Sequence, residues 1–159
     1  EPTDAALVVA EAIETFQAQA AGNDVALQAE LIAPLTGCAF DPARILQVLS
    51  NLLSNAIKFS SRGGRVIVRA ERIGIDLTIS VADTGAGIPS DKLEVIFERF
   101  RQLQGNDRRG LGLGLYISKC IVQGHGGRIW AESHLGAGSK FCFTLPQPPL
   151  AAAPTTRGN

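Results

Sequence analysis

The alternation of helical and strand periodicity along the chain is the feature that most restricts its fold. Apolar residues recur at helical spacing in residues 3–21, whereas residues 24–32 alternate between apolar and polar side chains as a half-buried strand does. Asp41 and Pro42 are typical of a helix N-cap and first turn, so a second helix is expected to begin there. Its predicted buried stripe is Ile45, Leu46, Leu49, Leu52, Leu53, Ala56 and Ile57.

The second half of the chain predicts two pairs of strands separated by helical segments. The four expected strands are residues 65–72, 75–82, 127–133 and 139–145. A short helix is expected from about Ser90 to Ile96, and a longer one from Leu113 to Gln123. The whole order predicts an α/β sandwich, in which one mixed, mostly antiparallel sheet carries helices on one face.

Composition and charge exclude several classes of protein. The 159 residues are 45% hydrophobic, which suits one domain with a full core. Fifteen basic residues balance fifteen acidic ones, so we expect no nucleic-acid partner and no direct membrane contact from this segment. The start does not resemble a signal peptide, and no apolar run is long enough to span a bilayer. Cys38, Cys120 and Cys142 are far apart, and we interpret all three as core hydrophobes in a reducing compartment. We expect this domain to be cytoplasmic, whether or not the parent protein is anchored in a membrane.

The second helix carries polar residues that helix stability does not explain. Asparagine is a poor helix former, yet Asn51 and Asn55 stand one turn apart and share a face. An amide oxygen is a neutral hard ligand, suited to a hydrated Mg²⁺ that bridges phosphates. Lys58 lies near the same face and can meet a phosphate as a point charge.

Two glycine-rich segments can approach a nucleotide closely. Asp83 begins the turn DTGAGIP after a strand, where its carboxylate can accept a hydrogen bond from an exocyclic amine. The glycines of this turn let the backbone come near a flat ring. In GLGLGL, Gly110, Gly112 and Gly114 leave amide groups at a helix N-terminus, where phosphates bind readily.

The segment RFRQLQGNDRRG, residues 99–110, is polar, without periodicity and long for a connection in one domain, so we expect it to form a mobile lid that a nucleotide orders. Its Arg101, Arg108 and Arg109 are well placed to reach terminal phosphates. Taken singly, the asparagines fit caps or a solvated face, Asp83 a turn acceptor, the glycines tight turns and the arginines a solvated loop. Taken together and in this order, the four features favour a nucleotide site.

Several other nucleotide sites can be excluded from the motifs. The chain lacks GxxxxGK[ST], so it has no P-loop. Gly110–Gly114 reads GxGxG rather than GxGxxG, so the dinucleotide fingerprint fails. HRD and DFG are both missing, which excludes the eukaryotic protein-kinase pattern.

These motifs resemble the ATP-binding catalytic domain of two-component sensor histidine kinases, in the superfamily of gyrase, Hsp90, histidine kinases and MutL. QVLSNLLSNAIKFS is similar to its N-box, VADTGAGIP to its G1 box, IFERF to its F-box and GLGLGLYIS to its G2 box. GAGSKFCFTLP is similar to its closing glycine turn and strand. The resemblance covers about residues 4–146 and implies the Bergerat fold, with ATP between the sheet and a flexible lid.

The resemblance also implies roles for single residues. Asn55 would be the Mg²⁺ ligand, Asn51 and Lys58 would serve the phosphates, and Asp83 would bind the adenine amine. Gly85 and Gly87 would shape the adenine pocket. The implied nucleotide-binding residues are Asn51, Asn55, Lys58, Phe59, Asp83, Gly85, Gly87, Ile88, Arg101, Gly110, Gly112, Leu113 and Gly114. Leu111 departs from the family, which commonly has Thr or Ser there, so lid contacts are expected to differ.

The residue at position 51 bears on the reaction. In the ATP-hydrolysing members of the superfamily, a glutamate four residues before the metal asparagine polarises the attacking water. Asn51 occupies that position here, and an amide is no general base, so we expect ATP to be held without efficient hydrolysis. The family phosphorylates a histidine followed by an acidic residue, whereas His125 and His134 precede Gly126 and Leu135. The phosphoacceptor is therefore expected on a dimerisation domain outside this chain, and His125 is interpreted as structural.

Residues 1–146 are thus predicted to form the catalytic domain of a histidine kinase, and residues 147–159 a Pro/Ala-rich linker or disordered tail. The expected cofactors are ATP and Mg²⁺. The expected partners are the dimerisation and phosphoacceptor domain of the same protein and a downstream response regulator or receiver domain. Two alternatives stay open: a superfamily ATPase, which Asn51 disfavours, and a nucleotide-binding regulatory or scaffolding module that transfers no phosphate.

Overall fold

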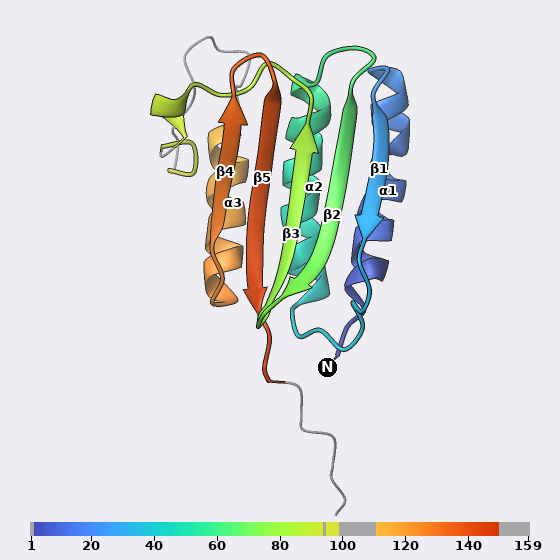
Figure 1. Cartoon of the computed structure of the whole chain (residues 1–159), viewed down its shortest axis with the longest axis vertical. Helices are drawn as coiled ribbons and strands as arrows, with labels where there is room; N and C mark the ends of the chain where they lie inside the picture. Colours follow the sequence, from blue (N-terminus) through green and yellow to red (C-terminus); the bar gives the residue numbers. More distant parts are fainter. Residues whose placement is uncertain (1, 94, 99–110, 150–159) are drawn as a thin grey trace, which may run out of the picture.

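Two layers, a sheet and a row of helices, make up the fold in the computed structural model, which describes residues 2–93, 95–98 and 111–149 (Figure 1). In chain order the elements are α1 (Ala5–Gly22), β1 (Ala26–Leu31), α2 (Pro42–Phe59), β2 (Arg65–Ile73), β3 (Asp76–Asp83), the 3₁₀ turn η1 (Ser90–Lys92), α3 (Leu111–Gly124), β4 (Ile129–His134) and β5 (Gly138–Pro146). This order of helices and strands is the one predicted from the sequence.

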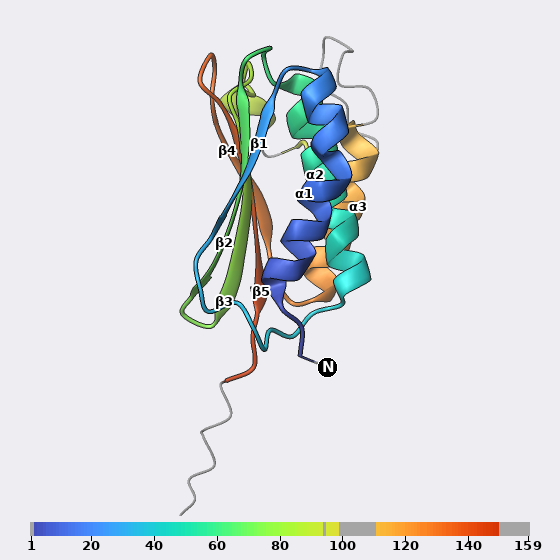
Figure 2. The ribbon, with the colours of Figure 1, turned by 90° about the vertical axis from the view of Figure 1, so that its right-hand side faces the viewer.

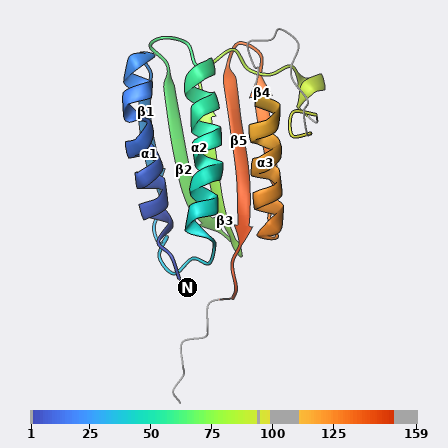
Figure 3. The same ribbon diagram turned by 180° about the vertical axis from the view of Figure 1, so that it is seen from behind.

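The five described strands form one sheet in the order β1-β2-β3-β5-β4. β1 pairs with β2 in parallel, and the other neighbours are antiparallel. All three described α-helices cover the same face of the sheet, as the side view shows (Figure 2), and α2 lies between α1 and α3 (Figure 3). The predicted mixed, mostly antiparallel sheet with helices on one face is therefore confirmed.

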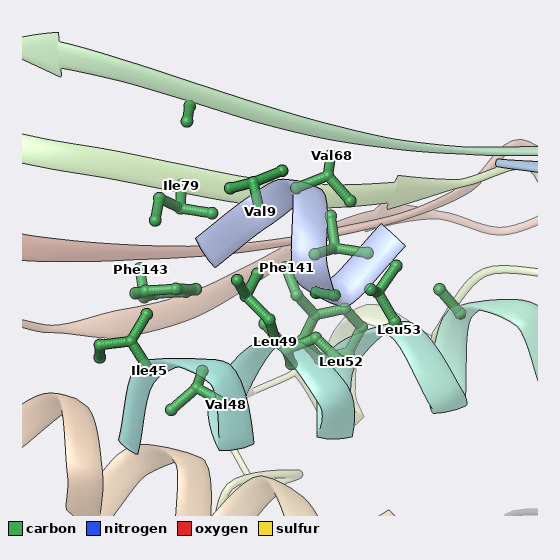
Figure 4. Packing of buried hydrophobic residues seen from close by; sticks show 14 of the residues in the cluster. Val9, Ile45, Val48, Leu49, Leu52, Leu53, Val68, Ile79, Phe141 and Phe143 are labelled. Carbon is green, nitrogen blue, oxygen red and sulfur yellow. The ribbon is translucent and has the colours of Figure 1, made fainter. Parts of the chain in front are cut away.

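The core lies between α2 and the covered face of the sheet (Figure 4). Alternate residues of each strand point toward the helices, so Val66, Val68 and Ala70 of β2 are wholly buried. Fully burying one such apolar side chain is worth roughly 1.5–3 kcal/mol. The buried residues of α2 are Ile45, Val48, Leu49, Leu52, Leu53, Ala56 and Ile57. Val48 thus joins the predicted stripe, whereas Leu46 is only partly buried at its edge.

Aspartates begin the first two helices. Asp4 is the N-cap of α1 and accepts a hydrogen bond from the Ala6 N–H. Asp41 caps α2 in the same way, accepting from Ala43 and Arg44, and Pro42 occupies the first turn. The predicted start of α2 is confirmed.

Some predicted boundaries differ from the structure for local reasons. β1 begins at Ala26 rather than residue 24, because Asp24 has a φ of 55° and is not extended. The helix expected over Ser90–Ile96 is only the 3₁₀ turn η1, since its backbone bonds span three residues, from the Lys92 N–H to the Pro89 carbonyl and from Leu93 to Ser90.

Gln147 lies in the predicted linker but belongs to the folded part of the chain. Its side chain is buried, and its amide exchanges two hydrogen bonds with the backbone of Ala39. Its own N–H donates to the Ile75 carbonyl at 2.7 Å. Packing therefore continues past Pro146 for at least one residue.

The prediction for the cysteines is right for two of the three. Cys38 and Cys142 are buried, and burial raises the pKa of both thiols, that of Cys142 to about 11. Cys120 is exposed, so its assignment to the core was wrong. It lies on α3 on the side away from the inward-facing Ser118 and Val122, where helical periodicity turns it to solvent. None of the described helices is both long and apolar enough to cross a membrane.

Candidate functional site

Three sequence motifs meet at one end of the two-layer fold. The last turns of α2, the turn that follows β3 and the first turn of α3 all lie at the same end of the sheet (Figures 1 and 3). Two contacts tie them together: Asn51 of α2 hydrogen bonds to Gly114 of α3, and Gly85 of the turn packs against the Phe59 carbonyl at the end of α2. The fold thus brings together segments that are far apart in the sequence.

Asn51 joins α2 to α3. Its side-chain nitrogen Nδ2 lies 3.2 Å from the Gly114 carbonyl oxygen and 3.2 Å from Oγ of Ser118. Ser118 is fully buried, so its hydroxyl needs an internal partner, which Asn51 supplies. Ser118 was not predicted as a site residue, although it follows Gly114 by one helical turn and therefore shares its face.

Asn55 and Lys58 remain available at the open end of α2. Asn55 is half-buried, and within residues 2–93, 95–98 and 111–149 its amide has no hydrogen-bond partner. Lys58 is exposed, and its ammonium lies 5.4 Å from the ring centroid of the half-buried Phe59. A neutral oxygen donor and a cation are thus presented one turn apart, which suits a metal-bound polyphosphate.

The turn after β3 is shaped by its own aspartate. Oδ1 of the half-buried Asp83 accepts a hydrogen bond of 2.8 Å from the Gly85 N–H. This bond fixes the orientation of the carboxylate at the sheet edge. Asp83 is therefore a turn acceptor, as one of the two interpretations of the sequence had it. The same bond also holds its carboxylate in a defined direction.

Both glycines of the turn have a packing reason as well. A Cβ on Gly85 would collide with the Phe59 carbonyl oxygen, and one on Gly87 would collide with the His134 carbonyl oxygen. Gly87 also has a φ of 84°, which disfavours any other residue. Their presence alone is consequently no sign of a ligand, because the fold itself requires them.

The β4–β5 hairpin holds the other side of the turn. The N–H of the buried Ile88 donates to Ser133 Oγ at 2.6 Å, and the Gly136 N–H donates to the Ala86 carbonyl at 2.8 Å. Ser133 in turn donates to the Gly138 carbonyl at 3.0 Å. Ser133 was not predicted as a site residue. The only signal for it in the sequence is its position on β4, where alternation puts it on the same face as Ile129 and Ala131. These hydrogen bonds connect the turn to the β4–β5 hairpin without any ligand.

The start of α3 supplies backbone donors. Gly112 and Leu113 lie in its first turn and Gly114 follows, with the Leu113 side chain exposed. The first four N–H groups of a helix have no partner within it, so they point at whatever occupies the end of the helix. Arg101 and Gly110, together with the predicted lid over residues 99–110, lie outside the described residues.

His125 lies apart from this constellation, whereas His134 meets its turn only through the backbone carbonyl beside Gly87. Nε2 of His125 accepts a hydrogen bond from the Asp41 N–H at 3.1 Å, and Nδ1 lies 2.9 Å from the Ile121 carbonyl oxygen. Both ring nitrogens are thus engaged at the opposite end of α3, beside a surface cavity of about 390 Å³, which supports the structural interpretation of His125. His134 is exposed at the end of β4, as predicted.

No group of three or more His, Cys, Asp or Glu side chains in the described part of the chain could hold a metal by itself. The donor set at the open end of α2 is instead the Asn55 amide, which has no partner among the described residues, beside Lys58. Such a set fits a Mg²⁺ ion that arrives with a nucleotide and keeps phosphate and water ligands.

Comparison with known proteins agrees with the geometry. The family described as "Histidine kinase-, DNA gyrase B-, and HSP90-like ATPase" matches residues 40–149, more than half of the chain. The adaptive-response sensory kinase SasA of Synechococcus elongatus is 48% identical over 108 residues, which cover 67% of this chain and 28% of that protein. The alginate biosynthesis sensor protein KinB of Pseudomonas aeruginosa is 40% identical over 139 residues, 87% of this chain and 23% of that protein.

Solved structures show the same fold. The catalytic domain of histidine kinase ThkA superposes with a TM-score of 0.82 at 28% identity, covering 92% of this chain and 95% of that domain. Full-length ShkA in complex with AMPPNP gives a TM-score of 0.83 at 33% identity, over 97% of this chain and 33% of ShkA. ThkA in complex with the response regulator TrrA gives 0.78 at 28% identity, over 94% of this chain and 42% of that chain. The chain spans about a quarter of the length of SasA and KinB.

Proposed function

The chain belongs to the family of histidine kinase-, DNA gyrase B- and HSP90-like ATPases, and we propose that it is the ATP-binding catalytic domain of a histidine protein kinase. In this proposal it binds Mg-ATP and transfers the γ-phosphate to a histidine on a dimerisation domain outside this chain. The observation that carries the proposal is the meeting of three motifs at one end of the fold, through the contacts of Asn51 with Gly114 and of Gly85 with Phe59.

We assign adenine recognition to the turn after β3. The Asp83 carboxylate, oriented by the Gly85 N–H, would accept the exocyclic amine of the base. Phe59 at the end of α2 and Ile88 within this turn would line the ring pocket. Because Ser133 holds the Ile88 backbone, the pocket needs little reorganisation on binding.

The phosphates would lie between α2 and the start of α3. Lys58 and the backbone N–H groups of Gly112, Leu113 and Gly114 are donors there, and Gly110 and Arg101 of the predicted lid would add to them. The Asn55 amide oxygen, unpartnered among the described residues, would hold Mg²⁺. When bound, the ion neutralises and orients the phosphates.

Within the described part of the chain, the site presents an amide at the position where water would be activated. Asn51 stands where a general base would be needed, and its N–H groups bond to Gly114 and Ser118. We therefore expect the γ-phosphate to react with a nucleophile other than water. A histidine ring nitrogen of the dimerisation domain would form the new N–P bond as the bond to the β–γ bridging oxygen breaks and ADP leaves.

The partners belong to the same proposal. SasA and KinB are longer proteins named as a sensory kinase and a sensor protein, and ThkA has been captured with the response regulator TrrA. We therefore expect the dimerisation domain of the parent protein and a response regulator to be the partners of this chain. A cytoplasmic location, where ATP is abundant, follows from the same reasoning.

Calorimetric titration with AMPPNP, with and without Mg²⁺, tests the nucleotide site directly. We expect binding that Mg²⁺ strengthens, and no heat at millimolar ligand would refute the proposed function. Adding the parent dimerisation domain and ATP should then label that domain on histidine. Binding without any labelling would favour a regulatory module, and sustained phosphate release by the chain alone would favour an ATPase.

A further inference from the structure

Ser118 contacts the asparagine at the proposed phosphate end of the site. It lies on α3, wholly shielded from solvent, with Oγ 3.2 Å from Asn51 Nδ2. The same nitrogen lies 3.2 Å from the Gly114 carbonyl oxygen. An amide nitrogen carries two hydrogens and cannot accept, so Asn51 has one N–H for each of these two acceptors.

The two bonds decide which end of the Asn51 amide a nucleotide would meet. With both N–H groups turned to α3, only the carbonyl oxygen Oδ1 is left for a ligand. A Cβ built on Gly114 would lie 3.9 Å from this oxygen, which therefore lies beside the Gly114 α-carbon. Phosphate oxygens are acceptors and gain nothing from a second acceptor, whereas a metal-bound water molecule donates to one.

We propose that Ser118 is a positioning residue, which together with the Gly114 carbonyl holds Asn51 so that its oxygen faces the hydration shell of the bound cation. This inference rests on the proposed function, because it assigns a direction within the same site. It revises the role that the family resemblance implies for Asn51, from a phosphate contact to a contact on the metal side.

Loss of the Ser118 hydroxyl has a specific consequence. The Gly114 carbonyl alone accepts one N–H of Asn51, and the other N–H is left without its partner in a half-buried position. The amide can then rotate and offer an N–H to the ligand instead of an oxygen. The benefit that Mg²⁺ brings to nucleotide binding should fall, while binding without Mg²⁺ should change little.

Calorimetry of AMPPNP with Mg²⁺ and with EDTA tests this on Ser118→Ala. The quantity compared is the dissociation constant measured with EDTA divided by the one measured with Mg²⁺. We expect this ratio to be about three- to tenfold lower in the variant than in the unmodified chain. The control is Ser80→Ala, since Ser80 is also buried but lies on β3 opposite Cys142, facing away from the helices. Its ratio should equal that of the unmodified chain.

The outcomes separate the two proposals. An unmodified chain that binds no AMPPNP refutes the proposed function, and this inference with it. Binding with an unchanged ratio in Ser118→Ala, or with equal losses in the presence and absence of Mg²⁺, refutes only the role of Ser118, because a general loosening of α3 would weaken both.

A measurement on the unmodified chain decides the question if Ser118→Ala does not fold. In ¹⁵N NMR spectra, both side-chain amide protons of Asn51 should exchange with solvent more slowly than those of Asn55, whose amide lacks a described partner. Both should stay in these bonds when Mg-AMPPNP is added. Scalar coupling between an Asn51 amide proton and a phosphorus nucleus would overturn the proposal.

Discussion

Alanine substitution of two glycines separates what the fold requires from what a nucleotide requires. At Gly114 a Cβ would meet Asn51 Cγ at 3.7 Å, an ordinary van der Waals contact, and the residue lies within α3. Gly114→Ala should therefore keep the fold and stabilise it by about 0.5–1 kcal/mol, the usual gain of Ala over Gly in a helix. At Gly85 the same atom would collide with the Phe59 carbonyl, so Gly85→Ala should cost roughly 1–3 kcal/mol through overpacking.

Thermal unfolding checks the two signs. For a chain of this size a change of 1 kcal/mol moves Tm by about 2–4 °C. We expect Gly114→Ala to melt at the same temperature or up to about 4 °C higher, and Gly85→Ala to melt several degrees lower. Gly124→Ala serves as a helical control, because a Cβ there has no described atom within 4 Å and the position lies at the far end of α3.

Nucleotide binding should follow a different order from stability. If the backbone of Gly114 contacts phosphate, a methyl group on it should cost about 1.5–3 kcal/mol by disturbing a hydrogen bond to a charged group. That loss raises Kd for AMPPNP roughly ten- to a hundredfold in a variant that is as stable as the parent. Unchanged affinity in Gly114→Ala would refute the assignment of Gly114 to the phosphates, and a lowered Tm would refute the packing argument.

Three further predictions concern the base, the reaction and the core. Asp83→Asn should keep the Asx bond to the Gly85 N–H but face the adenine amine with a donor, which costs about 1–3 kcal/mol of ADP affinity; calorimetry with ADP and GDP that finds no loss of preference would contradict this. The isolated chain should neither label itself nor release phosphate appreciably, because Asn51 is no base and both ring nitrogens of His125 are engaged; acid-labile, base-stable phosphate on either histidine would disprove it. Burial raises the pKa of Cys142 from 9.0 to about 11, so its contribution to stability is complete below pH 9 and is lost as pH rises toward 11; urea titrations should show a steeper alkaline decline in the parent than in Cys142→Ala.

Periodicity predicted the fold well because most of the chain is either buried or exposed by a simple rule. The stripe of α2 and the alternation in β2 follow directly from which face meets the core. The errors occur where local backbone geometry decides. The φ of Asp24 lies in the left-handed region, and the backbone hydrogen bonds of η1 span three residues rather than four. Neither feature is visible in the hydrophobic pattern of the sequence. Cys120 was placed in the core from its residue type, although its helical phase points outward.

The motifs named Asn51, Asp83 and Gly114, and the fold places all three at one end, but the motifs did not predict the bonds that these residues make. They could not predict that Ser133 would hold the turn after β3, since a serine on an alternating strand carries no signal of its partner. Nor could the motifs show that packing by itself requires glycine at positions 85 and 87. The atoms that a Cβ would meet there belong to Phe59 and His134, which are distant in sequence.

The contacts of Asn51 explain why this position cannot be exchanged for a glutamate without further changes. A carboxylate at position 51 cannot donate, so the Gly114 carbonyl would lose its partner and would face a negative charge near the 3.2 Å now spanned by a hydrogen bond. Ser118 could turn its hydroxyl to donate, but Gly114 has only a carbonyl to offer on that side. Gain of hydrolysis by Asn51→Glu would therefore come with a weaker contact between α2 and α3. The asparagine thus combines two properties: its amide cannot act as a base for water, and its side chain joins the helix that would hold the metal to the helix that would hold the phosphates.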